Sequence, residues 1–255
     1  MSWLARWGAG CLGFFAELGA ICTLAAEAIF GAFRRPFNLR NIAQQMDRVG
    51  VGSIPVVLIT ATFTGMVLAL QSYTGFKRFN AEGLVGTVVA LSMTRELGPV
   101  LTGLIVAGRA GAAMAAELGT MKVTEQIDAL ATLGVNPVKY LITPRLLAGI
   151  VMLPMLTALS DVVGIAGGYL LSVRVLDANP EVYIRRTTQY LEMIDIWGGL
   201  LKAAVFGGLI SVVSCYKGFR ADGGAEGVGR ATTGAVVLAQ MMILISDYFL
   251  TALLF

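Results

Sequence analysis

The feature that most constrains this chain is a series of apolar stretches, each about as long as a lipid bilayer is thick. Five stretches can be delimited, at residues 54–73, 83–119, 146–173, 196–216 and 232–255. A helix needs roughly 20 apolar residues to cross about 30 Å of hydrocarbon, and in lipid a spanning segment must satisfy its own backbone hydrogen bonds. We see no series of short alternating segments of the kind that forms a barrel. The sequence therefore predicts an all-α, polytopic membrane protein with five transmembrane helices.

The composition supports this fold class and excludes several functions. Only 14% of the 255 residues are charged and 56% are hydrophobic, whereas a soluble domain carries about 25% charged residues. The net charge of +3 is small, the chain contains no histidine, and its three cysteines are far apart. Imidazole-based catalysis is therefore excluded, and neither a metal centre nor a disulfide framework is expected. We predict no cofactor, no metal, no nucleic-acid partner and no enzymatic activity in this chain.

Residues 1–35 form an apolar segment that is interrupted by charges. Arg6 and Glu17 are separated by about three helical turns, so they share one helix face. A helix lying in the membrane interface, with Trp3 and Trp7 at headgroup depth, fits this pattern. A first transmembrane span and a signal peptide are the alternatives.

The distribution of Lys and Arg predicts the sidedness of the loops. Twelve basic residues fall on one side of the predicted spans: Arg6, Arg34, Arg35, Arg40, Arg48, Arg109, Lys122, Lys139, Arg145, Lys217, Arg220 and Arg230. Five fall on the other side: Lys77, Arg78, Arg174, Arg185 and Arg186. Because cytoplasmic loops carry the excess of Lys and Arg, we predict a cytoplasmic N-terminus and a C-terminus on the opposite side.

Charged residues inside the predicted spans are candidates for function, because each costs a few kcal/mol at the bilayer centre unless it is paired or hydrated. They are Arg95, Glu96, Asp161, Lys202 and Asp247, two positive and three negative. One interpretation is the polar lining of a cavity that accepts a headgroup, and the other is a structural ion pair that fixes helix register. For Asp161 and Asp247 the structural interpretation is favoured, with a neighbouring helix supplying the cation. Lys202 is a candidate partner for Glu96, besides Arg95.

Small residues recur at four-residue spacing in two of the spans. Gly111, Ala115 and Gly119 form one such series in the second span, and Gly164 and Gly168 repeat the spacing in the third. Faces of this kind let helix backbones approach closely. They indicate either packing within the chain or an interface between subunits.

The polar segment 120–140 has the pattern of a short cytoplasmic helix. Thr124 is expected to cap it and Gly134 to end it. Glu125 and Gln126 occupy its first turn, and an apolar face follows, formed by Ile127, Leu130 and Ala131. Such a helix predicts a docking partner; the alternative is that it lies on the membrane surface.

Several motifs together resemble the MlaE (YrbE) permease family, whose members are membrane subunits of MCE-type ABC lipid transporters. The motifs with the highest specificity are Ser92-Met-Thr-Arg-Glu-Leu-Gly-Pro-Val100, Ala107-Gly-Arg-Ala-Gly111, Ala116-Glu-Leu-Gly-Thr-Met121, Thr124-Glu-Gln-Ile-Asp-Ala-Leu130 and Leu133-Gly-Val-Asn-Pro137. The resemblance continues through Ile142-Thr-Pro-Arg145 and Gly229-Arg-Ala-Thr-Thr233 to Asp247-Tyr-Phe-Leu-Thr-Ala-Leu253. It covers nearly the whole chain, and the first 40 residues carry little of it.

The resemblance implies a single membrane permease domain that forms a homodimer in the bacterial inner membrane, with a periplasmic C-terminus. It implies a lipid cavity at the dimer interface, near Arg95 and Glu96, lined in part by the region 68–79. The candidate cavity residues are Leu68, Gln71, Tyr73, Phe79, Arg95, Glu96, Lys202 and Asp247. It also implies a coupling helix on which a separate ATPase docks, with the candidate residues Glu125, Gln126, Ile127, Asp128, Leu130 and Leu133.

These inferences combine into one expected function. Two copies of the chain, together with an ATPase subunit and a periplasmic MCE-domain protein, are expected to move phospholipid between the inner membrane and a periplasmic or outer-membrane carrier. The alternatives are an ion- or proton-coupled secondary carrier that uses the buried acids, and a membrane scaffold that does not transport. ATP dependence distinguishes the first alternative, and bound lipid in the purified protein distinguishes the second.

Overall fold

A computed structural model describes residues 3–33 and 39–254, with the side chains of residues 3–11, 13, 14 and 33 outside the description. The predicted placement of Trp3, Trp7 and Arg6 therefore lies outside the described side chains, and Arg34 and Arg35 lie outside the described residues. Within the described part all regular structure is helical. The all-α fold class is confirmed.

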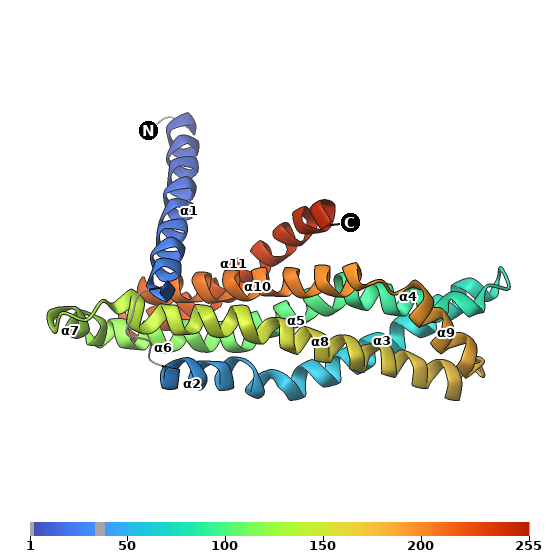
Figure 1. The fold of residues 1–255 in the computed structure, drawn as a ribbon. Helices are drawn as coiled ribbons and strands as arrows, with labels where there is room; N and C mark the ends of the chain where they lie inside the picture. Colours follow the sequence, from blue (N-terminus) through green and yellow to red (C-terminus); the bar gives the residue numbers. More distant parts are fainter. Residues whose placement is uncertain (1–2, 34–38, 255) are drawn as a thin grey trace.

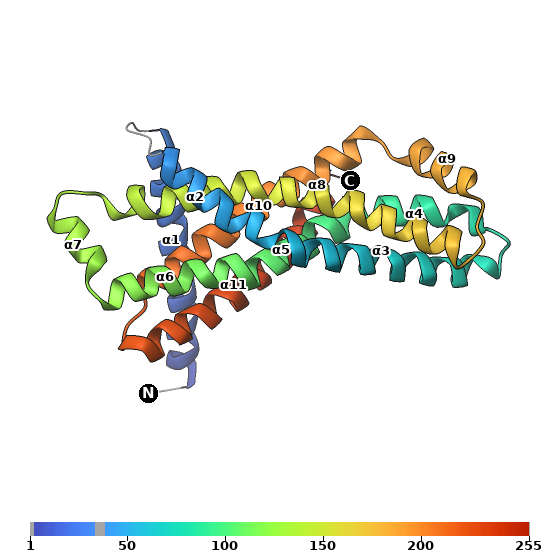
Figure 2. The ribbon, with the colours of Figure 1, turned by 90° about the horizontal axis from the view of Figure 1, so that it is seen from below.

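Helices that run along a common bundle axis form the body of the protein (Figures 1 and 2). They are α2 (Leu39–Val49), α3 (Ile54–Lys77), the segment from α4 to α6, α8 (Thr143–Arg174), α10 (Met193–Phe219) and α11 (Gly224–Leu254). The C-terminal part of α11 bends away from the bundle (Figure 1). The segment from α4 to α6 comprises α4 (Val85–Ser92), α5 (Gly98–Val106) and α6 (Ala112–Val123), joined by π-helical turns at Met93–Leu97 and Ala107–Gly111. Two short helices lie at opposite ends of the bundle, α7 (Gln126–Thr132) and α9 (Pro180–Tyr190).

Six helical segments in the described part are long and apolar enough to cross a membrane. They are Phe15–Ala32, Leu39–Lys77, Glu82–Val123, Val138–Arg174, Met193–Phe219 and Gly224–Leu254. The last five contain the five predicted spans. The chain is a multi-pass membrane protein.

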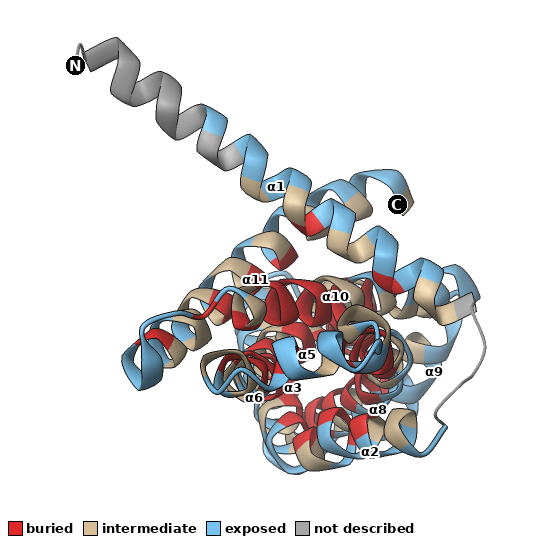
Figure 3. Ribbon diagram, turned by 90° about the vertical axis from the view of Figure 1, so that its left-hand side faces the viewer, coloured by how far each residue is buried: buried red, intermediate tan, exposed pale blue. Residues whose placement is uncertain are grey.

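The additional segment belongs to α1 (Trp3–Phe33), which runs crosswise to the bundle (Figure 1). Its direction fits a helix lying in the plane of the membrane, because the bundle helices must follow the membrane normal to cross the bilayer. Most of its described side chains are exposed, as Figure 3 shows by its pale colour. The interfacial placement of α1 stays a prediction, since its length and composition also allow a span.

Glycines set the distances between the central helices. A Cβ atom placed on Gly65 of α3 would lie 1.9 Å from the backbone oxygen of Gly164 in α8. On the other side of α8, a Cβ atom on Gly207 of α10 would lie 2.1 Å from the oxygen of Gly149. Only glycine permits such contacts, so α8 packs closely between α3 and α10.

The small-residue series predicted from the sequence serve packing within the chain at several of their positions. A Cβ atom on Gly111 would meet Ser214 of α10, and one on Gly119 would meet Ala221, just beyond α10. Gly164 and Gly168 of α8 face both α3 and the segment from α4 to α6, where Cβ atoms on them would meet Met93 and Val89. These positions therefore order the helices of one subunit.

The two ends of the bundle differ in the helices and charged residues that lie there. At one end the starts of α2 and α11 lie with α7, and at the other α9 lies beside the turn between α3 and α4 (Figure 2). The first end contains basic residues that the sequence predicts on one side of the membrane. Two of them form ion pairs between helices, since Glu117 contacts both Arg48 (3.0 Å) and Arg145 (2.9 Å). The predicted assignment of the loops to two opposite ends agrees with this arrangement, and the cellular orientation stays a prediction.

Candidate functional site

The candidate site begins with an irregularity in the second span. At Met93–Leu97 the helix widens into a π-helical turn, and the next turn contains Pro99, which has no backbone N–H to donate. Two backbone oxygens of this turn face α10. Gly199 of α10 packs against the oxygen of Thr94, where a Cβ atom would come within 2.0 Å. The Lys202 ammonium donates to the oxygen of Arg95 at 3.0 Å, so α10 satisfies a backbone acceptor inside the membrane.

Lys202 is the centre of the site. Its side chain is fully buried, yet it carries a charge within a membrane-spanning helix. Its Nζ atom contacts Glu96 Oε1 at 2.9 Å and Asp247 Oδ1 at 3.1 Å, and it donates to Thr251 Oγ1 at 2.7 Å. The Thr251 hydroxyl in turn donates to Glu96 Oε1 at 3.0 Å. Three helical segments are thus joined through one ammonium group.

Arg95 makes a separate ion pair. Its Nε and Nη2 atoms lie 2.8 Å and 2.7 Å from Asp195 Oδ1, at the start of α10. Asp195 is fully buried and also accepts from the backbone N–H of Glu192 at 2.9 Å, as part of a capping box. Glu96 therefore has Lys202 as its ion-pair partner, while the adjacent Arg95 pairs with Asp195.

The resulting cluster, which we call the Lys202 cluster, consists of Arg95, Glu96, Asp195, Lys202, Asp247 and Thr251. It holds two cations and three carboxylates. Some of these side chains are buried between the helices, and others are partly exposed. Lys202 and Asp195 are fully buried, whereas the side chains of Arg95 and Glu96 are 39% and 38% exposed. The inner pairs fix the helices, and the outer groups can meet a polar ligand. The structural and the functional interpretations of these charges are therefore compatible.

Two members of the Lys202 cluster were missed by the sequence reasoning. The predicted fourth span begins at residue 196, so Asp195 lies just outside it. The pattern Glu192-x-x-Asp195 is a helix-start signal that could have placed Asp195 in the first turn of α10. Thr251 follows Asp247 by four residues, so the same helix face of α11 carries both side chains.

Asp161 lies apart from the Lys202 cluster. Its carboxylate packs against Gly98, where a Cβ atom would come within 1.8 Å of Oδ1. This Oδ1 atom is buried and has no hydrogen-bond partner among the described residues. The cation expected from a neighbouring helix is present for Asp247 but is not seen for Asp161.

The predicted cavity residues of the region 68–79 lie in the last turns of α3 and just after it, toward the α9 end of the bundle. Leu68 and Tyr73 pack against the cluster of Val85 and Tyr183. Gln71 and Phe79 are exposed. Tyr73 and Tyr183 also line a cavity of about 240 Å³ between α3, α4, α8 and α9. Burial raises the pKa of the Tyr183 hydroxyl, which keeps it neutral.

The predicted coupling segment forms α7, although its start differs from the prediction. Thr124 does not cap the helix, because its hydroxyl donates back to the oxygen of Thr120 at 2.7 Å and so ends α6. Glu125 adopts a left-handed conformation (φ 59°) at the turn, and α7 begins at Gln126 without a side-chain cap. The predicted end is confirmed, since Gly134 has a φ of +75° and its N–H donates to Ala131.

The apolar face of α7 is used within the chain. Ile127 is buried and Leu130 is partly buried against a core cluster that includes Leu118 and Leu141. Asp128 is held by Lys122 at 2.9 Å. Ala131, the third residue of the predicted apolar face, is exposed, so the free surface of α7 is formed by Gln126, Ala129, Ala131 and Thr132 together with Leu133, which is 78% exposed.

Comparison with known proteins matches this architecture to one family. The sequence profile of the family described as Permease MlaE matches residues 42–253. The chain belongs to the MlaE permease family. The matched region of this MlaE permease contains the whole Lys202 cluster and α7, whereas α1 lies before it.

Individual relatives extend the similarity beyond the profile. A probable ABC transporter permease protein of Rickettsia typhi is 53% identical over 242 residues, which cover 95% of this chain and 93% of the relative. The protein TRIGALACTOSYLDIACYLGLYCEROL 1, chloroplastic, of Arabidopsis thaliana is 41% identical over 232 residues, 91% of this chain and 66% of the relative. The intermembrane phospholipid transport system permease protein MlaE of Haemophilus influenzae is 36% identical over 259 residues, 100% of this chain and 98% of the relative. As a member of a permease family, the chain is a transporter membrane subunit.

Proposed function

We propose that this permease is the membrane subunit of an ATP-driven transporter that moves phospholipid between the inner membrane and a periplasmic or outer-membrane carrier. The observation that carries the proposal is the Lys202 cluster, in which Arg95 and Glu96 present exposed charge from within a membrane-spanning helix. Charged groups at such depth mark a pathway for a polar group. The headgroup of a phospholipid is a polar group of this kind, and the names of the relatives in Haemophilus and Arabidopsis refer to lipids.

The cavity is proposed to form between two copies of the chain. Each copy would contribute one Lys202 cluster to a shared cavity, with Leu68, Gln71, Tyr73 and Phe79 lining its periplasmic side. The outer face of α11 can contact a second protein chain or lipid, because Tyr248, Phe249 and Leu253 are 71%, 65% and 81% exposed. In lipid such a face needs no polar groups, and two copies could pack their exposed apolar side chains together.

ATP hydrolysis is assigned to a separate subunit that docks at α7. The free surface around Gln126, Thr132 and Leu133 offers the contact. Ile127 and Leu130 pack against the core of the membrane domain, so a movement of the ATPase at α7 would displace that core. In this proposal α7 and the N-terminus lie in the cytoplasm, and a periplasmic MCE-domain protein binds at the opposite end.

The test is ATP-dependent transfer of labelled phospholipid by the full complex in reconstituted vesicles. Glu96→Ala is expected to impair transfer, because it removes an exposed carboxylate and leaves part of the Lys202 ammonium unpaired. Glu96→Gln keeps the shape and removes the charge, so its effect separates the two contributions. Glu181→Gln, on the exposed first turn of α9, is the matched control and should transfer lipid at the wild-type rate. Wild-type transfer by both Glu96 variants would refute the role of the cluster.

A proton-coupled carrier is the second candidate, and Asp161 is the observation in its favour. A buried carboxyl whose Oδ1 atom has no hydrogen-bond partner among the described residues is the type of group that such carriers protonate. Transport that follows a proton gradient in the absence of ATP would support this candidate and refute the ATP-driven mechanism.

A further inference from the structure

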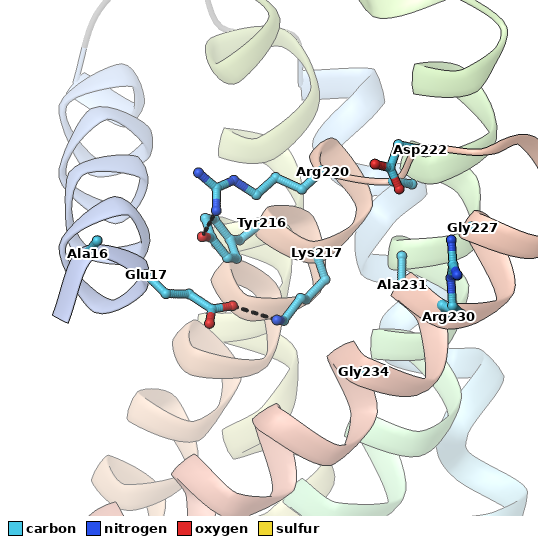
Figure 4. Close-up of a pocket in the computed structure, with 11 residues that line it drawn as sticks. Ala16, Glu17, Tyr216, Lys217, Arg220, Asp222, Gly227, Arg230, Ala231 and Gly234 are labelled. Carbon is cyan, nitrogen blue, oxygen red and sulfur yellow. Dashed lines mark hydrogen bonds and ion pairs between the residues drawn. The ribbon is translucent and has the colours of Figure 1, made fainter. Parts of the chain in front are cut away.

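A second polar site lies at the opposite end of α10 from Asp195. A pocket of about 450 Å³ opens between α1, the end of α10 and the start of α11 (Figure 4). Its polar lining residues are Glu17, Tyr216, Lys217, Arg220, Asp222 and Arg230. Small residues keep the space open; no atom lies within 4 Å of a Cβ atom placed on Gly234.

The pocket gathers positive charge around one tyrosine. The Arg220 guanidinium lies over the Tyr216 ring at 4.9 Å from its centroid, and its Nη1 atom donates to the Tyr216 hydroxyl at 2.6 Å. The Lys217 ammonium lies 5.9 Å from the same ring. Because the hydroxyl accepts from Arg220, its own proton remains available to an acceptor in the pocket. The buried Tyr216 thus holds Arg220 in place beside the open space.

The remaining charges leave the pocket suited to an anion. Lys217 is paired with Glu17 of α1 at 2.5 Å. Among the described residues, Arg230 pairs with Glu226 over a long distance of 3.7 Å, and the two side chains are 67% and 83% exposed. Such exposed pairs hold a side chain weakly, so Arg230 can turn toward a ligand. With Asp222 included, the lining carries three cations and two carboxylates.

The position of the pocket indicates where its ligand comes from. The pocket lies against α1, which runs crosswise to the bundle at the end where α7 is found (Figure 1). Near the pocket α1 exposes Leu12 and Phe15, which are 74% and 67% exposed. A helix with exposed apolar side chains that lies across the bundle end fits the predicted position in the membrane interface. Cationic groups beside it meet phospholipid headgroups.

We infer that this pocket binds the phosphate of an anionic phospholipid in the leaflet that contacts α1, with Arg220, Arg230 and the Tyr216 hydroxyl as its donors. Planar guanidinium groups bind phosphate through paired hydrogen bonds, and the helix start of α11 adds a favourable dipole. Glu17 competes with the phosphate for Lys217. The bound lipid is a resident that holds α1 against the bundle, distinct from any lipid transported at the Lys202 cluster.

The test measures lipid binding by the purified full chain in a neutral detergent. Dioctanoyl phosphatidylglycerol is titrated, and Kd is obtained from the rise of the thermal unfolding midpoint, since a ligand that binds only the folded state stabilises it. Dioctanoyl phosphatidylcholine is the control lipid that carries no net charge. Inorganic phosphate is the control that offers the same anion without a lipid. We expect saturable binding of phosphatidylglycerol and much weaker binding of the other two. Equal binding of phosphatidylcholine would overturn the recognition of net charge, and tighter binding of inorganic phosphate would overturn the lipid assignment.

Variants locate the site. Arg220→Gln/Arg230→Gln should weaken phosphatidylglycerol binding by at least about tenfold, because two charge-assisted hydrogen-bond donors are lost. Arg185→Gln/Arg186→Gln removes the same charge at the opposite end of the bundle and should leave Kd unchanged. Equal loss in both double variants, or no loss in the first, would refute the pocket as the site.

Two further variants separate this site from the proposed transport function. Glu17→Gln should tighten binding, because Lys217 becomes free to contact the phosphate; unchanged or weaker binding would refute the competition. Glu96→Gln should leave this Kd unchanged, since Glu96 belongs to the Lys202 cluster. Weaker phosphatidylglycerol binding by the Glu96→Gln protein would show that the two sites are not separate. That result would overturn the inference of a separate resident lipid.

Discussion

Replacing Lys202 by methionine tests whether the Lys202 cluster holds the membrane domain together. The Lys202 side chain is fully buried and contacts two carboxylates, Glu96 at 2.9 Å and Asp247 at 3.1 Å. Methionine fills a similar volume but leaves both acids without their cation. Removing one partner of a buried ion pair costs about 3–5 kcal/mol in the free energy of unfolding.

The expected loss lies at the lower end of that range. Glu96 is 38% exposed and Asp247 is 18% exposed, so part of each charge can be hydrated once Lys202 is absent. A loss of about 3 kcal/mol lowers the unfolding midpoint of a protein of this size by roughly 6–12 °C. The assay is thermal unfolding of the purified protein in detergent, followed by tryptophan fluorescence.

Two reference proteins interpret the result. Lys202→Met/Glu96→Gln/Asp247→Asn removes the orphaned charges together with the cation and should regain most of the lost stability, because a buried ion pair replaced as a whole is often nearly neutral. Lys122→Met breaks a partly exposed pair and should cost less than about 1 kcal/mol. A single Lys202→Met protein that unfolds at the wild-type midpoint, or a triple variant as unstable as the single one, would refute the reasoning.

Three further predictions follow from helix packing, docking and sidedness. Gly207→Ala places a Cβ atom 2.1 Å from a backbone oxygen of α8 and should lower the free energy of unfolding by about 1–3 kcal/mol; Gly229→Ala, with no atom within 4 Å, should be neutral in the same thermal assay. Leu133→Arg should leave folding intact, because the side chain is 78% exposed, but should abolish co-purification of the ATPase and transport, while Glu181→Gln in α9, at the opposite end of the bundle, retains both. Retention of the ATPase by the Leu133→Arg protein would show that α7 is not the docking site. Cysteines at Leu133 and Arg185 in a cysteine-free background should react with impermeant reagents from opposite sides, and labelling from one side would overturn the topology.

The membrane-spanning helices could be predicted from the sequence, because the surrounding hydrocarbon dictates their structure. Hydrocarbon forces each long apolar run to be a helix, so all five predicted spans were found within the helices of the structure. Local chemistry also determined the end of α7, because the left-handed conformation at Gly134 favours glycine. The boundaries shifted outward, since α6 continues to Val123 and α11 begins at Gly224. Polar residues can extend a helix beyond the membrane without changing the hydropathy signal.

Pairing between helices was decided only by the tertiary structure. The sequence named Arg95, Glu96, Lys202 and Asp247 as candidates, but it could not show that Arg95 pairs with Asp195, one hundred residues away. Such pairing depends on how each helix is rotated, and that rotation is set by close contacts such as those at Gly199 and Gly207. The same reason explains why the apolar face of α7 packs on its own chain. A pattern of apolar residues reveals that a face is buried, and only the packed fold shows what buries it.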